Sequence, residues 1–238
     1  MSDAPEQSYK IVRKFIPKRL QPYLRGFRKR LARPQALEQP YKSVFSYTQA
    51  HPVRQRNLVR LCGLIEQRKV SGSIVECGVL DGGTAALMAY STKTRSIHLF
   101  DSWEGLPEIT TEDGDGGEWV GQVVGSPKRV QAIMRELRVD PARLNFHKGW
   151  FSDTFPDASI DQIALLHADG DFYESVKLTL ETWAPKVSPG GFIQLDDYGI
   201  FVGCTKAVDE FLSQRPHLKL EYVEHQARAY FIEIPLRT

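Results

Sequence analysis

Two acidic clusters, each at the end of an apolar run, are the residues of this chain best suited to chemistry. Residues 167–171 read His-Ala-Asp-Gly-Asp, and Asp196 and Asp197 stand side by side further along. The runs before them, 163–166 and 191–195, read as buried strands, and neighbouring strand ends in an open α/β sheet meet at one ligand-binding edge. Carboxylates gathered there repel one another unless a cation or a proton lies between them. The pattern predicts a divalent-metal site of oxygen ligands, with solvated strand-end aspartates as the alternative.

A glycine-rich turn follows another apolar run, over residues 73–77. Residues 78–84 read GVLDGGT, and glycines at such a turn let the backbone pass close to a ligand. The spacing is GxxxGG rather than GxGxxG, which disfavours a dinucleotide. The acidic Glu76 and Asp81 favour a cationic ligand such as S-adenosylmethionine, and Asp101, after the next apolar run, could accept hydrogen bonds from ribose hydroxyls. The alternative is a tight turn without a ligand.

Alternating strand and helix patterns from about residue 52 place these clusters in an α/β fold. We expect a doubly wound, mostly parallel, seven-stranded sheet that closes with an antiparallel hairpin. The expected strands are 73–77, 96–100, 144–148, 160–169, 191–196, 218–225 and 227–234, and the expected helices are 52–69, 84–90, 127–137, 172–180 and 204–212. Residues 103–126 are predicted to form a loop, either a lid with Trp119 as a stacking face for a sugar or an ordinary surface loop; Ser126 is expected to cap the helix that follows.

The bulk composition fits one large domain. The chain has 238 residues, of which 42% are hydrophobic, a content typical of globular proteins. No apolar run approaches the roughly 20 residues needed to span a bilayer, and the first residues lack the apolar core of a secretory signal. The three cysteines, Cys62, Cys77 and Cys204, form no CxxC pair. These observations predict a cytoplasmic protein without a disulfide framework or a zinc site.

The positive charge is concentrated at one end. Residues 1–37 carry ten Lys/Arg and two Asp/Glu, so we divide the chain into a basic, proline-interrupted arm (1–40) and a domain (41–238). The arm also carries apolar residues. It could contact an anionic membrane surface weakly or bind a phosphorylated partner, or it could instead dock on its own domain or on a second subunit. The rest of the chain is mildly acidic, which disfavours a nucleic-acid groove.

Five motifs, in order, resemble the macrocin O-methyltransferase family, whose members methylate deoxysugar hydroxyls in macrolide and aminocoumarin biosynthesis. They are ECGV (76–79), DSWEGLP (101–107), GWFSDT (149–154), DGDFYES (169–175) and SPGGF (188–192) followed by DDYG (196–199). The resemblance covers about residues 45–214 and implies a Rossmann-like methyltransferase sheet. It also implies an enzyme that moves a methyl group from S-adenosylmethionine to a hydroxyl of a sugar-containing small molecule with the help of Mg²⁺. The alternatives are a methyltransferase of a phenolic or catechol hydroxyl, a non-catalytic cofactor-binding module and, disfavoured by the glycine spacing, a nicotinamide oxidoreductase.

Residue roles follow from the same resemblance. The implied metal ligands are Asp169, Asp196 and Asp197, and the implied general base is Asp171. His167 competes for the role of base, although a buried core histidine is the favoured interpretation for it and for His147. The expected cofactor contacts are Thr48, Glu76, Gly78, Gly82, Thr84, Asp101, Ser102, Gly149 and Trp150. The chain departs from the family at Thr48-Gln49 (usually Thr-Met), at Leu80-Asp81 (usually aromatic-basic) and at His167-Ala168 (commonly Arg-Leu). The resemblance also implies self-association.

Overall fold

A seven-stranded sheet forms the centre of the molecule, in the order β3-β2-β1-β4-β5-β7-β6. The computed structural model describes residues 17, 20–31, 36–223 and 228–236. The strands are β1 (Ser73–Cys77), β2 (Ile97–Asp101), β3 (Leu144–Lys148), β4 (Ile163–Ala168), β5 (Val187–Leu195), β6 (Leu220–Tyr222) and β7 (Tyr230–Glu233). Strands β1 to β5 run parallel, whereas β7 is antiparallel to both β5 and β6. The predicted doubly wound sheet with its closing hairpin is confirmed, and its strand order reverses between β1 and β4.

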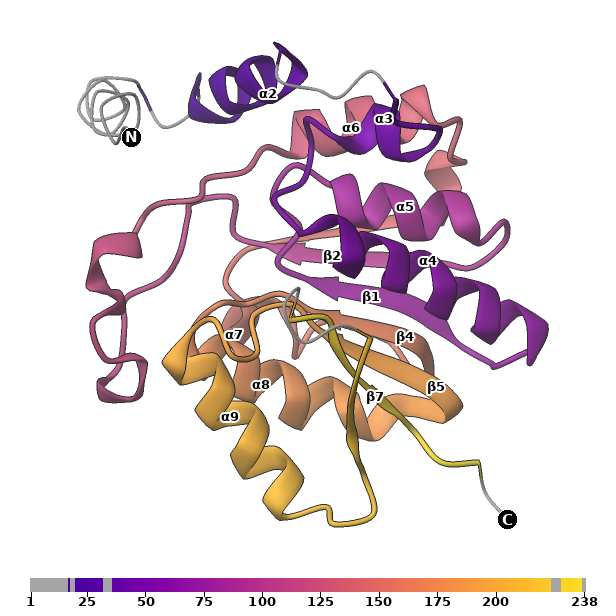
Figure 1. The fold of residues 1–238 in the computed structure, drawn as a ribbon, viewed down its shortest axis with the longest axis vertical. Coiled ribbons are helices and arrows are strands. Elements are labelled where there is room, and N and C mark those ends of the chain that lie inside the picture. Colours follow the sequence, from indigo (N-terminus) through magenta and orange to yellow (C-terminus); the bar gives the residue numbers. More distant parts are fainter. Residues whose placement is uncertain (1–16, 18–19, 32–35, 224–227, 237–238) are drawn as a thin grey trace.

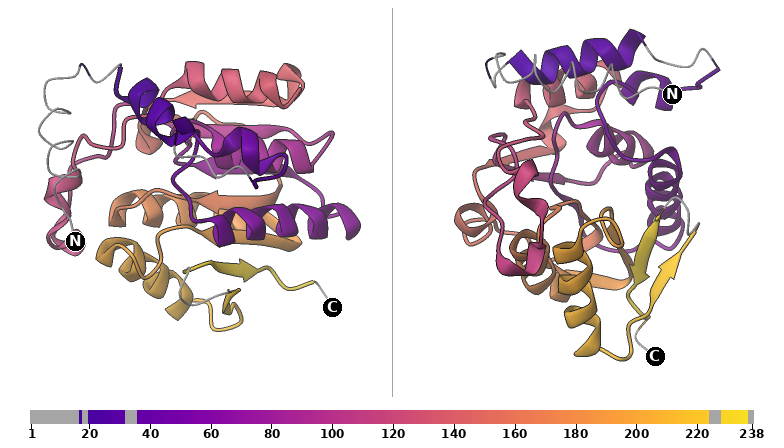
Figure 2. Two further views of the ribbon diagram at one scale, coloured as in Figure 1. Left: turned by 45° about the horizontal axis from the view of Figure 1, so that its top comes forward. Right: turned by 60° about the vertical axis from the view of Figure 1, so that its left-hand side comes forward.

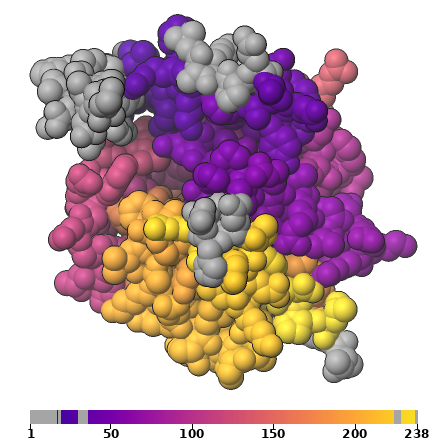
Figure 3. Space-filling view, viewed as in Figure 1, coloured from indigo at the N-terminus to yellow at the C-terminus, as the bar shows by residue number. Residues whose placement is uncertain are grey.

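Helices cover both faces of this sheet (Figure 1). They are α2 (Gln21–Leu31), α3 (Tyr41–Val44), α4 (Pro52–Gln67), α5 (Gly83–Ser91), α6 (Pro127–Glu136), α7 (Phe151–Thr154), α8 (Tyr173–Trp183) and α9 (Val202–Ser213). Because successive side chains of a strand point to opposite faces, β1 sends Ile74 into the core under α4 and α5 and Val75 into the core under α8 and α9. The space-filling view shows the region of α4 beside the C-terminal strands (Figure 3), and the guanidinium of Arg60 lies 5.0 Å from the centre of the Phe231 ring.

Several predicted boundaries were wrong. Strand β5 begins at Val187 rather than residue 191, because the Ser-Pro-Gly-Gly segment extends the strand; Gly190, at φ +80°, donates its N–H to Ile234 O. Strand β4 begins at Ile163 rather than residue 160, and helix α8 continues to Trp183, whose side chain is fully buried. Ser126 occupies the N-cap position of α6 but makes no capping hydrogen bond in the described structure. Proline at the first helical position needs no N–H partner and fixes a helical φ, and this is sufficient to start the helix.

Part of the basic arm packs on the domain. Helix α2 begins at Gln21, includes Pro22 in its first turn and lies across the end of the molecule that carries α3 and α6 (Figures 1 and 2). Of the alternatives for the arm, docking on its own domain describes this helix. The predictions for residues 1–16 lie outside the described residues. None of the described helices combines the length and the apolar character needed to cross a membrane.

His98 on β2 and His147 on β3 form a half-buried pair at the edge of the sheet. His98 Nδ1 lies 3.0 Å from His147 Nε2, and His147 stacks on Phe100 with ring centroids 4.1 Å apart. Burial and the charge of His147 lower the pKa of His98 from 6.5 to about 4. Burial also lowers the pKa of His147. The prediction that His147 is a structural histidine agrees with this packing.

The histidine pair predicts an acid-sensitive fold. The pair stays neutral in the folded protein, whereas the unfolded chain takes up protons as the pH falls below 6.5, so the free energy of unfolding decreases between pH 6.5 and about 4. Urea titrations at several pH values in this window should show a smaller decrease for His98→Gln than for the wild type. His217→Gln, at an exposed position, is the control and should follow the wild type. Parallel curves for the wild type and His98→Gln would contradict the prediction.

Candidate active site

The two acidic clusters meet at the carboxyl edge of the sheet. Ala168 and Leu195, the last residues of β4 and β5, are direct partners in the parallel ladder, so Asp169 and Asp196 leave the sheet side by side. The Asp196 N–H donates to Ala168 O at 3.0 Å, and the Asp171 N–H donates to Asp197 Oδ2 at 3.3 Å. The expected meeting of these four residues is confirmed.

Cationic side chains offset the charge of Asp196. Its Oδ1 lies 3.4 Å from His167 Nε2, and Arg54 of α4 donates to its Oδ2 and to its backbone carbonyl. Burial would raise the pKa of Asp196, but the hydrogen bond from His167 and the charges of Arg54 and His167 hold it below its ordinary value. Asp196 is therefore an ionised, charge-balanced carboxylate. Arg54 could not be predicted as a partner of Asp196, because it lies 142 positions away along the chain.

His167 is fully buried, as predicted for a core histidine, but it is part of a charged network. Its Nδ1 lies 2.8 Å from Glu76 Oε1, and its Nε2 faces Asp196. Burial alone would lower the pKa of His167, yet its contacts with Asp196 and Glu76 raise it to about 9. The side chain is an imidazolium that joins the ends of β1, β4 and β5. His167, Asp169 and Asp196 each offer one potential metal-ligand atom, and these three atoms lie within 4.8 Å of one another.

The other three carboxylates repel one another. Burial and the charges of Asp196, Asp197 and Asp171 raise the pKa of Asp169 well above its ordinary value. Burial and the charges of Asp197 and Asp196 do the same for Asp171, and burial and Asp196 raise the pKa of Asp197 to about 6. A cation placed among them would relieve this repulsion, and carboxylate oxygens are the ligands that Mg²⁺ prefers.

The backbone that presents Asp171 is strained. Asp171 adopts φ +56°, a left-handed conformation that is uncommon for residues other than glycine. The Phe172 N–H donates to Gly170 O at 2.6 Å and closes the tight turn. On the other side, a Cβ on Gly78 would lie 1.8 Å from Asp169 O, so only glycine lets the end of β1 come this close. Strain of this kind occurs where a fold holds a residue in a functional position.

The glycine loop, residues 78–84, is held by Asp101 at the end of β2. Asp101 Oδ2 accepts the N–H groups of Val79 and Leu80, both at 2.8 Å, and its Oδ1 accepts the Trp103 N–H at 2.6 Å. Burial raises the pKa of Asp101, against the effect of these three donors. The ribose contact of Asp101 stays a prediction, whereas its role in ordering the loop is seen in the structure.

The expectation that Asp81 makes the glycine loop attractive to a cationic ligand was wrong. The Asp81 side chain is 1% exposed, pairs with Arg25 at 2.7 Å and lies 3.2 Å from Arg129 Nε, so the protein itself neutralises its charge. Glu76 is also fully buried and faces His167, while its Oε2 has no hydrogen-bond partner among the described residues. The sequence places both acids beside the loop, but only the tertiary structure supplies their partners.

A cavity of about 750 Å³ adjoins the carboxylates and the glycine loop, a volume within the roughly 300–1,000 Å³ range of small-molecule sites. Of the expected cofactor contacts, those that line it are Thr48, Gly78, Thr84, Asp101, Ser102, Gly149 and Trp150. Glu76 and Gly82 are not among its lining residues: Glu76 lies beneath the loop, and a Cβ on Gly82 would meet Val130 of α6. All four aspartates line the cavity.

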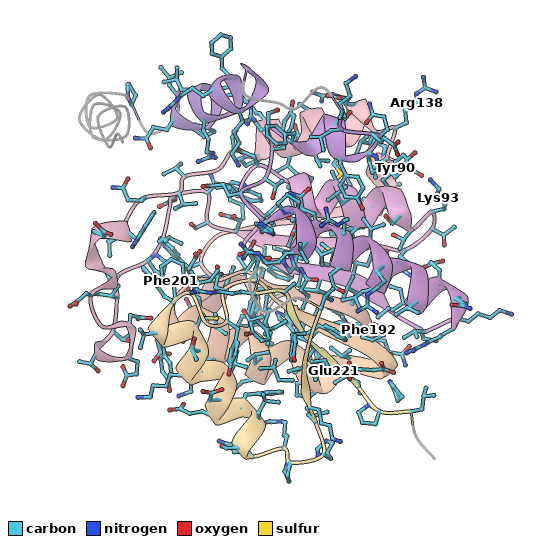
Figure 4. All side chains as sticks on the ribbon, viewed as in Figure 1. Tyr90, Lys93, Arg138, Phe192, Phe201 and Glu221 are labelled. Carbon is cyan, nitrogen blue, oxygen red and sulfur yellow. The ribbon has the colours of Figure 1, made fainter. Side chains whose placement is uncertain are left out.

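The segment 103–126 forms a second wall of the cavity. It contains two short 3₁₀ helices, Thr111–Asp113 and Gly116–Trp119, rather than an irregular loop throughout. Asp113 accepts the Tyr173 N–H at 2.7 Å and ties the segment to the start of α8. Trp119 lines the cavity and meets the ring of Phe201 edge-on at 6.3 Å; Figure 4 labels Phe201 at the start of α9. Aromatic and carboxylate groups therefore face the same cavity.

Comparison with known proteins agrees with this architecture. Residues 11–228 match the family model described as macrocin-O-methyltransferase (TylF). The chain is 37% identical over 154 residues to the demethyldecarbamoylnovobiocin O-methyltransferase of Streptomyces niveus, a match that spans 60% of this chain but only 58% of that relative. It is 32% identical over 191 residues to the 8-demethyl-8-(2,3-dimethoxy-alpha-L-rhamnosyl)-tetracenomycin-C 4'-O-methyltransferase of Streptomyces olivaceus, covering 76% of this chain and 72% of the relative.

A solved structure is similar over most of the chain. The O-methyltransferase NovP superposes with a TM-score of 0.73 at 29% sequence identity, covering 80% of this chain and 83% of that one. This similarity supports the methyltransferase fold for this chain, in which helices cover both faces of a seven-stranded sheet. Because the family model matches most of the chain, the resemblance inferred from the motifs is confirmed, and the chain belongs to the macrocin O-methyltransferase family.

Proposed function

We propose that the protein transfers a methyl group from S-adenosylmethionine to a hydroxyl of a sugar or of a glycosylated small molecule, with the help of Mg²⁺. The observation that carries this proposal is the cavity shared by the glycine loop and by Asp169, Asp171, Asp196 and Asp197. The names of two relatives, a demethyldecarbamoylnovobiocin and a rhamnosyl-tetracenomycin O-methyltransferase, support a sugar-containing acceptor.

The cofactor would occupy the end of the cavity near the glycine loop. S-adenosylmethionine, when bound, supplies the methyl group from its sulfonium. The loop backbone, fixed by Asp101, would lie against it, and Ser102 and the Gly149-Trp150 turn would hold its nucleoside part. Thr48 lines the same cavity, whereas the buried Glu76 would act through His167 and the ends of the strands.

The carboxylates fit a divalent cation. Asp169, Asp196 and Asp197 would hold Mg²⁺, and the mutual repulsion that raises the pKa of Asp169 and Asp197 is what such an ion would relieve. When bound, Mg²⁺ would stabilise the negative charge that develops on the acceptor hydroxyl. The pairing of Asp196 with His167 and Arg54 keeps that carboxylate ionised and fixed in place.

Asp171 would accept the proton of the acceptor hydroxyl. Burial, which a bound ion would leave in place, raises the pKa of Asp171 and makes it a stronger base than an ordinary aspartate; base catalysis typically contributes about 10²- to 10⁴-fold. Both ring nitrogens of the buried His167 face carboxylates, which makes it a weaker candidate for the base. The side chains of Trp119 and Phe201 would position the acceptor against Asp171.

Asp101→Asn is expected to weaken the binding of S-adenosylhomocysteine by about tenfold, because an amide replaces one of the two acceptors that order the glycine loop and Trp103. Calorimetric titration of the variant measures the effect. Asp157→Asn, a substitution at an exposed position, should leave the Kd unchanged. If the wild type, Asp101→Asn and Asp157→Asn bound S-adenosylhomocysteine with equal affinity, Asp101 would be removed from the cofactor site.

Calorimetry with two ligands tests the proposed cofactor directly. We expect S-adenosylhomocysteine to bind the wild-type protein and NAD not to bind. Binding of NAD alone would favour the oxidoreductase alternative, and binding of neither would refute the proposal. An acceptor panel that includes catechols as well as glycosides distinguishes the two methyltransferase alternatives.

We also propose that the protein works in the cytoplasm, self-associates and contacts anionic membrane surfaces weakly through residues 1–37. Its three cysteines are free and buried, which agrees with a reducing compartment. Helix α2 exposes Tyr23, Leu24 and Phe27, and Leu20 is exposed just before it; the same helix carries Arg25, Arg28 and Lys29. Sedimentation with anionic vesicles should decrease for Phe27→Ser, and light scattering gives the assembly size; an unchanged vesicle-bound fraction would contradict the membrane contact.

A further inference from the structure

Helix α2 approaches the cofactor end of the cavity very closely. Pro22 and Gly26 form its buried face, and a Cβ on Gly26 would lie 2.1 Å from Arg129 Nη2. Arg129 of α6 is itself buried, donates to Ser46 O at 2.6 Å and lies 4.4 Å from the centre of the Tyr47 ring. The small residues of α2 therefore allow a contact that a larger side chain would prevent.

Arg25 of α2 joins two walls of the cavity. Its Nη2 donates to Asp81 Oδ2 of the glycine loop at 2.7 Å and to Val124 O, near the end of the segment 103–126, at 2.9 Å. The side chains of Arg25 and Asp81 are 14% and 1% exposed, so solvent screens this ion pair little. Removing the arginine would leave Asp81 buried with Arg129 as its remaining cationic partner.

Lys29, one helical turn after Arg25, reaches a third wall, because its Nζ donates to Thr48 O. Thr48 lines the cavity, as do Val79 and Leu80 of the glycine loop and Val123 beside Val124. One helix thus contacts three of the chain segments that line the cavity, although none of the described side chains of α2 belongs to the lining itself.

We propose that α2 is a functional part of the cofactor site and that Arg25 is a positioning residue. By binding Asp81 and Val124 O together, it holds the glycine loop and the end of the segment 103–126 at the separation that the cofactor needs. This inference rests on the proposed function, since the ligand is S-adenosylmethionine. The helix acts on affinity through the backbone of the loop and touches neither the acceptor nor Asp171.

Calorimetric titration with S-adenosylhomocysteine tests the proposal without an acceptor. Arg25→Met removes the charge but keeps the length of the side chain, and its Kd should rise by about tenfold or more. Arg25→Lys restores the contact with Asp81 but lacks the planar guanidinium, and its Kd should lie between those of Arg25→Met and the wild type. Arg135→Met, the same change at an exposed position of α6, is the control and should bind like the wild type.

The outcomes are distinct. A wild-type Kd for Arg25→Met, or a Kd for Arg25→Lys no better than that of Arg25→Met, would overturn the positioning role. If circular dichroism shows that Arg25→Met does not fold, Lys29→Met decides: a weakened Kd supports the proposal, and an unchanged Kd overturns it. Failure of the wild-type protein to bind S-adenosylhomocysteine refutes the proposed function and this inference with it, whereas wild-type binding with unaffected variants refutes the inference alone.

Discussion

Asp171→Asn is expected to lower the rate of methyl transfer by about 10²- to 10⁴-fold, with the Kd for S-adenosylhomocysteine within about twofold of the wild-type value. Asparagine keeps the size of the side chain and the N–H that binds Asp197, but it cannot accept a proton. The strained backbone at φ +56° is retained as well, since asparagine tolerates the left-handed region. Initial rates with labelled S-adenosylmethionine, together with calorimetry, separate catalysis from binding.

The matched control for this experiment is Asp153→Asn on α7, where the carboxylate is exposed and accepts a hydrogen bond from Ser152. It should retain the wild-type rate. Undiminished turnover by Asp171→Asn would remove Asp171 from the role of base. His167→Gln would then be the next variant, although it also removes a charge from between Glu76 and Asp196.

Asp169→Asn is expected to raise the Mg²⁺ concentration for half-maximal activity by at least about tenfold. Asp169 lies among three other carboxylates whose charges raise its pKa, and a cation bound to it would relieve that repulsion. Asp196→Asn should also shift the midpoint, but it disturbs Arg54 and His167 at the same time. Titration of Mn²⁺ followed by electron paramagnetic resonance measures the affinity without turnover.

Asp161→Asn, at an exposed position before β4, controls for the loss of one negative charge. It should leave the Mn²⁺ affinity and the Mg²⁺ midpoint at their wild-type values. A midpoint for Asp169→Asn equal to that of the control would show that Asp169 does not ligate the ion.

The sequence was sufficient to predict the framework of the site. The apolar runs that became β1 and β3 have the predicted bounds, and the acidic clusters meet because they end adjacent parallel strands. These features depend on local periodicity and on the geometry common to parallel sheets. The early start of β5 escaped prediction, because the ladder with its neighbours incorporates a Ser-Pro-Gly-Gly segment that is typical of a turn.

The charge balance of the site could not be predicted in the same way. Arg54 reaches Asp196 across 142 positions, and Arg25 reaches Asp81 across 56. No local pattern specifies such pairs, since they depend on how α4 packs on the sheet and how α2 packs against α6 and the glycine loop. For this reason Asp81 was interpreted as an accessible acid beside the glycine loop, when it is a buried partner of two arginines.

Transfer of a labelled methyl group from S-adenosylmethionine to a panel of glycosides, with Mg²⁺ present or chelated, tests the central claim most directly. We predict labelled product with at least one glycoside when Mg²⁺ is present, and loss of that product when the ion is chelated and again in Asp171→Asn. Product formation that is unchanged by chelation and by Asp171→Asn would contradict the claim that these carboxylates activate the acceptor hydroxyl.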